Sequence, residues 1–195
     1  MKEAQSAFQL AARALEFRNF VVLDEFGVNV AMFPRYGRSR AGQRIRVKRP
    51  LNKGRNRTFI GAISEQGGLR AFTVLPGSST LTNFLEWVAK HLLPTLHPGQ
   101  VVLMDNLRAH RNDQVRQLIE SVGAHVLYTP PYSPEFNPIE ECWSKIKNTV
   151  RKAMARTEDA LLAATYAASK HVTLDDIGGW FKHASVYWRG AAQCS

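Results

Sequence analysis

Two short apolar runs of nearly the same sequence place the strongest limit on the fold of this chain. Residues 20–25 read FVVLDE and residues 101–106 read VVLMDN, so each run is rich in β-branched side chains and reaches an aspartate. Apolar runs of this length are typical of strands that are buried on both faces of a sheet. Further strands are predicted at 28–33, 58–64, 69–75 and 124–128, with a hairpin turn at 66–68 that joins 58–64 to 69–75.

Helical spacing of apolar residues surrounds these runs. It predicts helices at 81–93, 113–122, 137–153 and 157–170, an amphipathic helix within 1–17, and a last helix that starts at 175 or 176. Strands that come first as a meander and then alternate with helices favour a mixed sheet with helices on both faces, in a single α/β domain. We expect an N-terminal helix at 1–18, a core at 19–156, and C-terminal helices at 157–195 that pack on the core.

Several classes of protein are excluded by the sequence. No apolar run approaches the roughly 18 residues of a membrane-spanning helix, and the N-terminal residues lack the continuous apolar segment of a signal peptide. The two cysteines, Cys142 and Cys194, form no CxxC pair and no ligand cluster, which argues against a disulfide framework and a structural zinc site. A cytoplasmic location is therefore expected.

The positive charge of the chain is concentrated in one segment. The sequence has 26 Lys and Arg against 16 Asp and Glu, a net charge of +10. Segment 35–57 holds ten of these basic residues and no acid, so the rest of the chain is neutral overall. An unbalanced basic tract predicts a polyanion partner, most often nucleic acid; the alternative is a solvated loop. The ten candidate DNA-binding residues are Arg35, Arg38, Arg40, Arg44, Arg46, Lys48, Arg49, Lys53, Arg55 and Arg57.

Asp24 and Asp105 stand at the ends of the two apolar runs. In α/β sheets, ligands bind at the carboxyl ends of the strands, so adjacent parallel strands would bring these two carboxylates close together. Two close carboxylates repel each other unless a cation lies between them, and Mg²⁺ favours such oxygen ligands. The alternative is that each aspartate merely closes its strand as a turn residue.

A third carboxylate, Glu140, follows a proline-rich tract. Residues 130–143 read PPYSPEFNPIEECW, and the four prolines within 130–138 predict a stiff extended segment that leads into a helix. With Asn137 as the N-cap and Pro138 first in the helix, Glu140 lies at the edge of the apolar face, where it can turn toward the two aspartates. The alternative is that Glu140 only completes a capping box.

Other residues near these carboxylates have weaker claims. Glu141 is predicted to point to solvent and to pair with Lys145, and Glu135 lies in the loop as a weaker candidate ligand. Asn106 and His110 are auxiliary candidates. Asn106 could position the site through hydrogen bonds, and His110 could touch phosphate or orient a metal-bound water, unless it is simply a packing residue at a helix start.

The spacing of the three carboxylates resembles that of a known family. Asp24, Asp105 and Glu140, with 34 residues between the last two, resemble the DDE catalytic triad of the IS630/Tc1/mariner transposases. The tract YSPEFNPIEECW resembles the signature of that superfamily around its catalytic glutamate, and Asp105-Asn106 followed by His110 resembles its second-aspartate motif. The opening VVLDEFG, followed by YGRSRAGQR, resembles bacterial IS630 members in particular.

This resemblance implies a fold, a reaction and a set of partners. The core would have an RNase H-like fold, with a five-stranded mixed sheet, helices on both faces and the three carboxylates at its centre. A DNA transposase of this kind would use two Mg²⁺ or Mn²⁺ ions to cleave transposon ends and to transfer the 3′-OH strand to a TA step in target DNA. Asp24 would bridge the ions, Asp105 would complete one site and Glu140 the other. The partners would be transposon ends, target DNA and, in the active complex, a second copy of the chain.

One feature departs from the family, and two other functions stay open. Family members carry paired helix-turn-helix segments ahead of the catalytic domain, whereas only residues 1–19 precede the first predicted strand. Recognition of specific transposon ends by this chain alone is therefore not expected, and the chain could be the catalytic half of a two-frame element, a truncated element or a shortened sequence. One alternative is an RNase H-like nuclease or resolvase that hydrolyses DNA without strand transfer. The other is an inactive remnant that only binds DNA or a protein.

Overall fold

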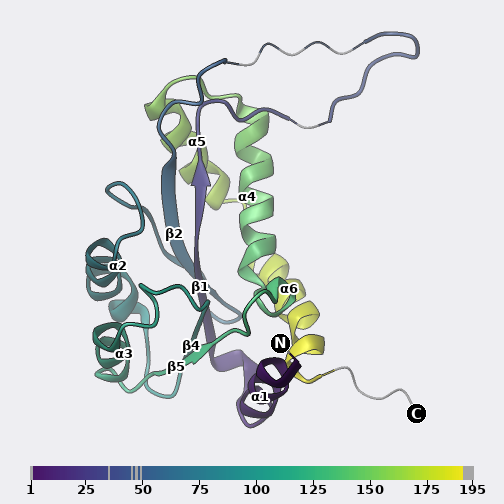
Figure 1. Ribbon diagram of the computed structural model, residues 1–195. Helices are drawn as coiled ribbons and strands as arrows, with labels where there is room; N and C mark the ends of the chain where they lie inside the picture. Colours follow the sequence, from purple (N-terminus) through teal and green to yellow (C-terminus); the bar gives the residue numbers. More distant parts are fainter. Residues whose placement is uncertain (1, 35, 45, 47, 49, 191–195) are drawn as a thin grey trace.

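A single mixed sheet of five strands forms the centre of the molecule (Figure 1). The computed structural model describes residues 2–34, 36–44, 46, 48 and 50–190. The strands lie in the order β3-β2-β1-β4-β5, and β1 pairs antiparallel with β2 and parallel with β4. Their bounds are β1 Phe20–Val28, β2 Arg57–Ser64, β3 Gly68–Val74, β4 Val101–Met104 and β5 His125–Tyr128. The predicted five-stranded mixed sheet is confirmed, with the first apolar run as its central strand.

Helices cover both faces of the sheet, as predicted (Figure 1). On one face pack α1 (Lys2–Arg13), α4 (Ile139–Ala153), α5 (Glu158–Ser169) and α6 (Leu174–Trp188). On the other face pack α2 (Leu81–Trp87), the π-helical turn η2 that continues it (Val88–Leu92), and α3 (Asp113–Glu120). Three short 3₁₀ segments complete the described elements: η1 (Phe17–Asn19), η3 (Leu93–Thr95) and η4 (Pro134–Phe136). None of the helices in the described part of the chain has the length and apolar character that crossing a membrane requires.

The alternation of side chains along β1 assigns its residues to the two faces. Phe20, Val22 and Phe26 are buried in the core under α4 and α6, whereas Val21 and Leu23 are buried in the core under α2 and α3. Because successive side chains of a strand point to opposite faces, Asp24 lies on the α4 face and the next residue, Glu25, lies on the α2 and α3 face. The two adjacent acids therefore have different neighbours.

The strand predicted at 28–33 does not form. Instead β1 continues through Gly27 to Val28, and Val28 pairs with Arg57 of β2. The chain then turns, because the side chain of Asn29 accepts a hydrogen bond from the Ala31 backbone N–H (3.1 Å) and the Asn29 carbonyl accepts one from the Met32 N–H (3.2 Å). Asparagine competes with sheet pairing in this way, and a run of apolar residues gave no warning of it.

Candidate active site

Asp24 and Asp105 meet just beyond the last pair of the parallel ladder between β1 and β4. Asp105 follows β4 directly, whereas Asp24 does not end its strand, because β1 continues to Val28. The ladder between β1 and β4 pairs Val22 with Leu103. Asp24 lies two residues after Val22, and Asp105 lies two residues after Leu103. Both lie on the α4 face by alternation from those partners. On the other side of β1, Asp24 is opposite Gly61 of β2. Because glycine has no side chain, β2 places none beside the Asp24 carboxylate.

The proline-rich tract brings Glu140 to the same place. Its 3₁₀ turn η4 buries Phe136, whose ring packs edge-on against Phe8 of α1 with centroids 5.2 Å apart. The indole N–H of Trp188 on α6 donates to the Phe136 carbonyl oxygen at 2.9 Å. Elements from both ends of the described chain therefore fix the loop, and α4 starts immediately after it, with Glu140 in its first turn.

The capping alternative for Glu140 is wrong. Helix α4 starts at Ile139 rather than at 137, and Pro138 at its N-cap makes no side-chain capping bond. The contact at this end is a backbone one, from the Glu140 N–H to the Asn137 carbonyl at 3.2 Å. Proline lacks a side-chain acceptor, so no capping box forms, and the Glu140 carboxylate is exposed at the edge of the helix.

A cavity of about 450 Å³ joins the three carboxylates. Asp24, Asp105 and Glu140 all line it, together with Asn106 and much of the proline-rich tract. Among the residues that the structure describes, no group of three or more His, Cys, Asp or Glu side chains is close enough to hold one ion jointly. The three acids thus surround one hollow without converging on a single point.

The pKa of Asp24 is raised from 3.8 to about 7. Burial is the largest cause, because it penalises the charged form of the carboxylate. The Glu25 backbone N–H counteracts part of this effect, and the negative charges of Glu140, Glu25 and Asp105 raise the pKa further. Three neighbouring acids therefore act on Asp24 electrostatically, which is the situation that a bound cation relieves.

A buried histidine joins Asp105 to Glu25. His110 has no exposed surface; its Nδ1 lies 2.6 Å from Asp105 Oδ1 and its Nε2 lies 3.3 Å from Glu25 Oε1. Since carboxylates only accept hydrogen bonds, this geometry favours a ring that carries protons on both nitrogens. Burial alone would lower the His110 pKa, but the hydrogen bonds and charges of Asp105 and Glu25 outweigh it and raise the pKa to about 9.

The same network changes Asp105. Burial tends to raise its pKa, but the hydrogen bonds from His110 and from the Leu107 backbone N–H, with the charge of His110, hold it below its ordinary value. Asp105 is therefore charged where Asp24 is partly protonated. Because His110 is fully enclosed, the suggested contact between this histidine and phosphate is ruled out in this conformation.

Asn106 braces the loop after β4. Its side-chain amide donates a hydrogen bond to the Thr129 carbonyl at the end of β5, and the Thr129 N–H donates to the Met104 carbonyl at 2.9 Å. Asn106 also lines the cavity, so a positioning role agrees with its place. Glu135, the weaker candidate, is not among the described residues that line the cavity.

Glu141 makes a different contact from the one predicted. Its Oε1 lies 2.9 Å from His183 Nδ1 on α6. Lys145, the expected partner, instead pairs with Asp176 at the start of α6. Glu141 and Lys145 of α4 therefore both contact α6. Helix α6 packs closely enough to supply partners that helical spacing alone did not reveal.

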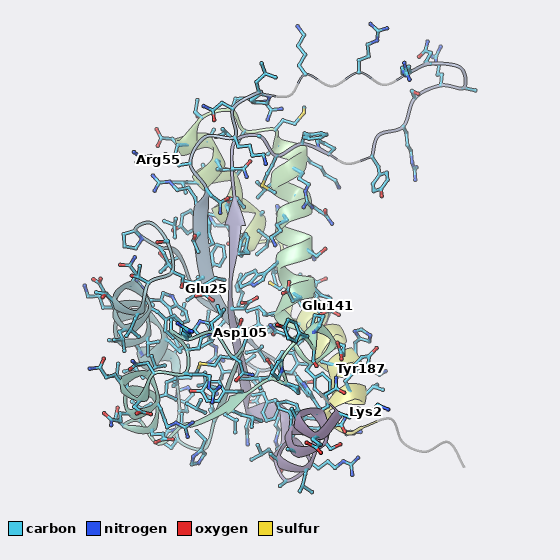
Figure 2. All side chains as sticks on the ribbon, viewed as in Figure 1. Lys2, Glu25, Arg55, Asp105, Glu141 and Tyr187 are labelled. Atoms are coloured by element: carbon cyan, nitrogen blue, oxygen red, sulfur yellow. The ribbon has the colours of Figure 1, made fainter. Side chains whose placement is uncertain are left out.

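The basic tract forms the long connection from β1 to β2. In Figure 1 its described part extends beyond the sheet past the C-terminal end of α4, and Figure 2 labels Arg55 near its base. Seven of the ten candidates are described and exposed: Arg38, Arg40, Arg44, Arg46, Lys48, Lys53 and Arg55. Arg57 differs, because it is the first residue of β2 and forms an ion pair with Glu158 of α5. Arg35 and Arg49 lie outside the described residues.

One site residue, Glu25, was missed at the level of sequence. Glu25 accepts a hydrogen bond from the Ser79 hydroxyl at 2.5 Å as well as contacting His110. A signal was present, because adjacent acids at a strand end must point to opposite faces. Nothing in the sequence, however, indicated that the loop carrying His110 passes under the second acid.

Comparisons with known proteins agree with this geometry. A family model described as DDE superfamily endonuclease matches residues 19–162. No curated protein matches the sequence. Among solved structures, the Mos1 transposase paired-end complex with left transposon end has a TM-score of 0.74 at 14% identity and covers 96% of this chain and 58% of that chain. The catalytic domain of Mos1 mariner transposase has a TM-score of 0.67 at 12% identity and covers 96% and 87%.

These matches have different weights. At such low identity the likeness to Mos1 shows the fold, which is the RNase H-like fold of transposase catalytic domains. This chain spans 58% of the length of the Mos1 chain in the paired-end complex. The family model covers well over half of this chain and shows its membership. The family predicted from the Asp24, Asp105 and Glu140 spacing is confirmed: this chain belongs to the DDE superfamily endonucleases.

Proposed function

We propose that this chain is the catalytic domain of a transposase that cuts DNA at transposon ends and joins the freed 3′-OH to target DNA. The observation that carries the proposal is the cavity lined by Asp24, Asp105 and Glu140, in which burial and neighbouring acids raise the pKa of Asp24 to about 7. Perturbed carboxylates gathered in a hollow are typical of catalytic sites. Family membership supplies the class of reaction, cleavage of a phosphodiester.

The donor set fits divalent metal ions. The three side chains offer only oxygen donors, which Mg²⁺ and Mn²⁺ prefer, and a cation would relieve the repulsion at Asp24. Asp24, Asp105 and Glu140 would hold two such ions, with Asp24 contributing to both, Asp105 to one and Glu140 to the other. When bound, the ions would supply activation of the attacking oxygen and stabilisation of the leaving oxygen in an in-line phosphoryl displacement. Two relatives of the same fold, Mos1 mariner paired-end complexes, were solved with Mn and with Mg.

The chain's own residues prepare this site before DNA arrives. Asp24 is buried on the central strand β1, which restricts its side chain. The proline-rich tract limits how far Glu140 can move, and Asn106 ties the Asp105 loop to β5. The stiff tract has little conformational freedom to lose when the substrate binds. Each carboxylate is therefore supported by a different element.

The DNA contacts are proposed for the exposed part of the basic tract. Its described members present positive charge without an acid within the tract, which suits a phosphate backbone. Arg57 is left out of this set, because Glu158 already pairs with it. The same proposal includes strand transfer, the TA target, action as a homodimer and origin from an IS630-type element. It also includes the division into a helix at 1–18, a core at 19–156 and helices at 157–195.

A cleavage assay on end-containing DNA tests the proposal. With Mn²⁺ present, the chain should nick the DNA, and Asp24→Asn or Asp105→Asn should lower the rate at least about a thousandfold. Glu141→Gln is the matched control, since this neighbour of Glu140 contacts His183 instead of lining the cavity. Full activity in Asp24→Asn would contradict the assignment. Cleavage without joined products would indicate that the chain is a nuclease rather than a transposase.

A further inference from the structure

Within the described part of the chain, only one of the two carboxylate oxygens of Asp105 accepts hydrogen bonds. Its Oδ1 accepts hydrogen bonds from the Leu107 N–H at 3.0 Å and from His110 Nδ1 at 2.6 Å. The side chain is 35% exposed, and it lines the cavity that holds Asp24 and Glu140. With Oδ1 occupied twice, Oδ2 is the oxygen left to face an incoming ligand.

The histidine that holds Oδ1 is itself held from three sides. Its ring packs against Phe84 of α2, with centroids 4.4 Å apart, and its carbonyl accepts a hydrogen bond from the Tyr128 hydroxyl at 3.0 Å. Its second nitrogen faces Glu25, which also accepts from Ser79. A buried ring with these contacts has one orientation, so it can fix the rotation of the Asp105 carboxylate.

Glu25 connects this arrangement to the strand that carries Asp24. The two acids are adjacent in β1, one on each face of the sheet, and Glu25 is almost fully buried. A chain of contacts therefore runs from Ser79 through Glu25 and His110 to Asp105. It links the middle of β1 to the end of β4 from the side opposite to the cavity. Figure 2 shows Glu25 and Asp105 together in the middle of the molecule.

We infer that His110 is a positioning residue for metal binding: anchored by Glu25, it holds Asp105 so that Oδ2 is presented to the cavity as a single-oxygen ligand. The inference rests on the proposed function, because it concerns the ions assigned there to Asp24, Asp105 and Glu140. Histidine and carboxylate partners behind a metal ligand fix its orientation, and their loss typically weakens metal affinity about 10–100-fold.

The test measures the binding of Mn²⁺ alone, by calorimetric titration of the full chain without DNA. His110→Phe keeps a ring beside Phe84 but removes both donors, so we expect the Mn²⁺ dissociation constant to rise about 10–100-fold. His110→Gln retains one donor and should recover part of the affinity. His125→Phe is the matched control, because it makes the same change at an exposed histidine of β5 that does not line the cavity, and its Mn²⁺ affinity should stay unchanged.

A second variant guards against loss of folding. Glu25→Gln keeps the shape of the side chain, so the variant should have the circular dichroism spectrum of the wild type. It should still weaken Mn²⁺ binding severalfold. Wild-type Mn²⁺ affinity in folded His110→Phe or in Glu25→Gln would overturn the inference. Asp24→Asn and Asp105→Asn are titrated alongside. If these two also bind Mn²⁺ normally, the proposed metal site itself is wrong; if only they lose binding, the positioning role alone is wrong.

Discussion

At the scale of single residues, Asp24 combines burial with the repulsion of three nearby acids, and this combination costs stability in the absence of metal. Its pKa is 3.8 in an unfolded chain and about 7 in the folded protein. Between these values the unfolded chain has released the proton and the folded chain keeps it, so stability falls as pH rises from 3.8 to about 7 and is constant above. The cost at pH 8 is at most about 4 kcal/mol.

Asp24→Asn should therefore stabilise the metal-free protein. In EDTA, we expect its free energy of unfolding to exceed that of the wild type increasingly from pH 4 to pH 7 and by a constant amount above pH 7, because the amide has no charge to bury. Urea denaturation at several pH values measures the difference, and His110 titrates in both proteins. Saturating Mn²⁺ should then stabilise the wild type and not the variant. A difference that is independent of pH would contradict the raised pKa.

The three carboxylates could be found in the sequence because the ends of apolar runs and the starts of helices are local features. Asp24 and Asp105 close apolar runs, and Glu140 follows prolines that restrict the chain. The network behind them could not be found in this way. Contact between His110 and Glu25 depends on where a loop passes across the far face of β1, and that path is set by packing against Phe84 of α2.

At the scale of elements, α4 packs against β2 at Gly61, a position of the sheet that carries no side chain. A Cβ at Gly61 would lie 3.1 Å from the Phe72 ring and 3.2 Å from the Trp143 ring. Trp143 is fully buried on α4, three residues after Glu140, and Gly61 is opposite Asp24. The absence of a side chain at Gly61 thus lets the helix bring Glu140 close to the strand that carries Asp24.

Gly61→Val should disturb stability and the site together. Overpacking of this kind costs about 1–3 kcal/mol in the free energy of unfolding, and it should also move the first turn of α4 away from β1. We expect Mn²⁺-dependent cleavage, corrected for the folded fraction, to fall at least about tenfold. Gly178→Ala in α6 is the control, since an added Cβ there meets nothing within 4 Å. Unchanged cleavage in folded Gly61→Val would show that Glu140 does not depend on this contact.

Arg156 fastens the basic tract, residues 35–57, to the C-terminal side of α4. Its guanidinium donates to the carbonyls of Val30 (3.0 Å) and Met32 (3.1 Å) before the tract, and to that of Lys48 (3.5 Å) within it. Arg156→Ala should free this segment and speed tryptic cleavage within the tract severalfold, while thermal stability changes little because the bonds are exposed. Lys152→Ala removes a nearby charge without these bonds and should be cleaved at the wild-type rate. Equal rates for both variants would rule out the anchoring role.

Element prediction failed where side chains redirect the backbone. The apolar residues at 28–33 have strand composition, yet the Asn29 side chain bonds to the Ala31 N–H and turns the chain. The helix predicted from 137 begins two residues later, because the proline-rich tract forms its own 3₁₀ turn around Phe136. The first difference comes from a local side-chain bond, and the second comes from a segment that tertiary contacts of Phe136 hold in place.

At the scale of the whole molecule, the net charge of +10 equals the charge of segment 35–57, seven of whose ten basic residues are described and exposed, on an otherwise neutral chain. A clamp of this kind should dominate the salt dependence of DNA binding, because each phosphate that it neutralises releases a counterion. The alternative, a solvated loop, predicts no such contribution. The two readings differ in a measurable slope even where the absolute affinity is similar.

Arg38→Gln combined with Arg40→Gln should lower the slope of log K against log salt by roughly 2 on duplex DNA, since each phosphate contact contributes about 0.9. The matched control is Arg18→Gln combined with Lys90→Gln, which removes the same charge from residues already paired with Glu16 and Glu86. Fluorescence anisotropy between 50 and 200 mM salt would measure both slopes, over the range in which phosphate contacts change affinity most. A loop that contacts DNA loses slope only in the first variant. Equal slopes in the two variants would make the charge a general property of the surface, and the loop would then have no part in holding the substrate over Asp24, Asp105 and Glu140.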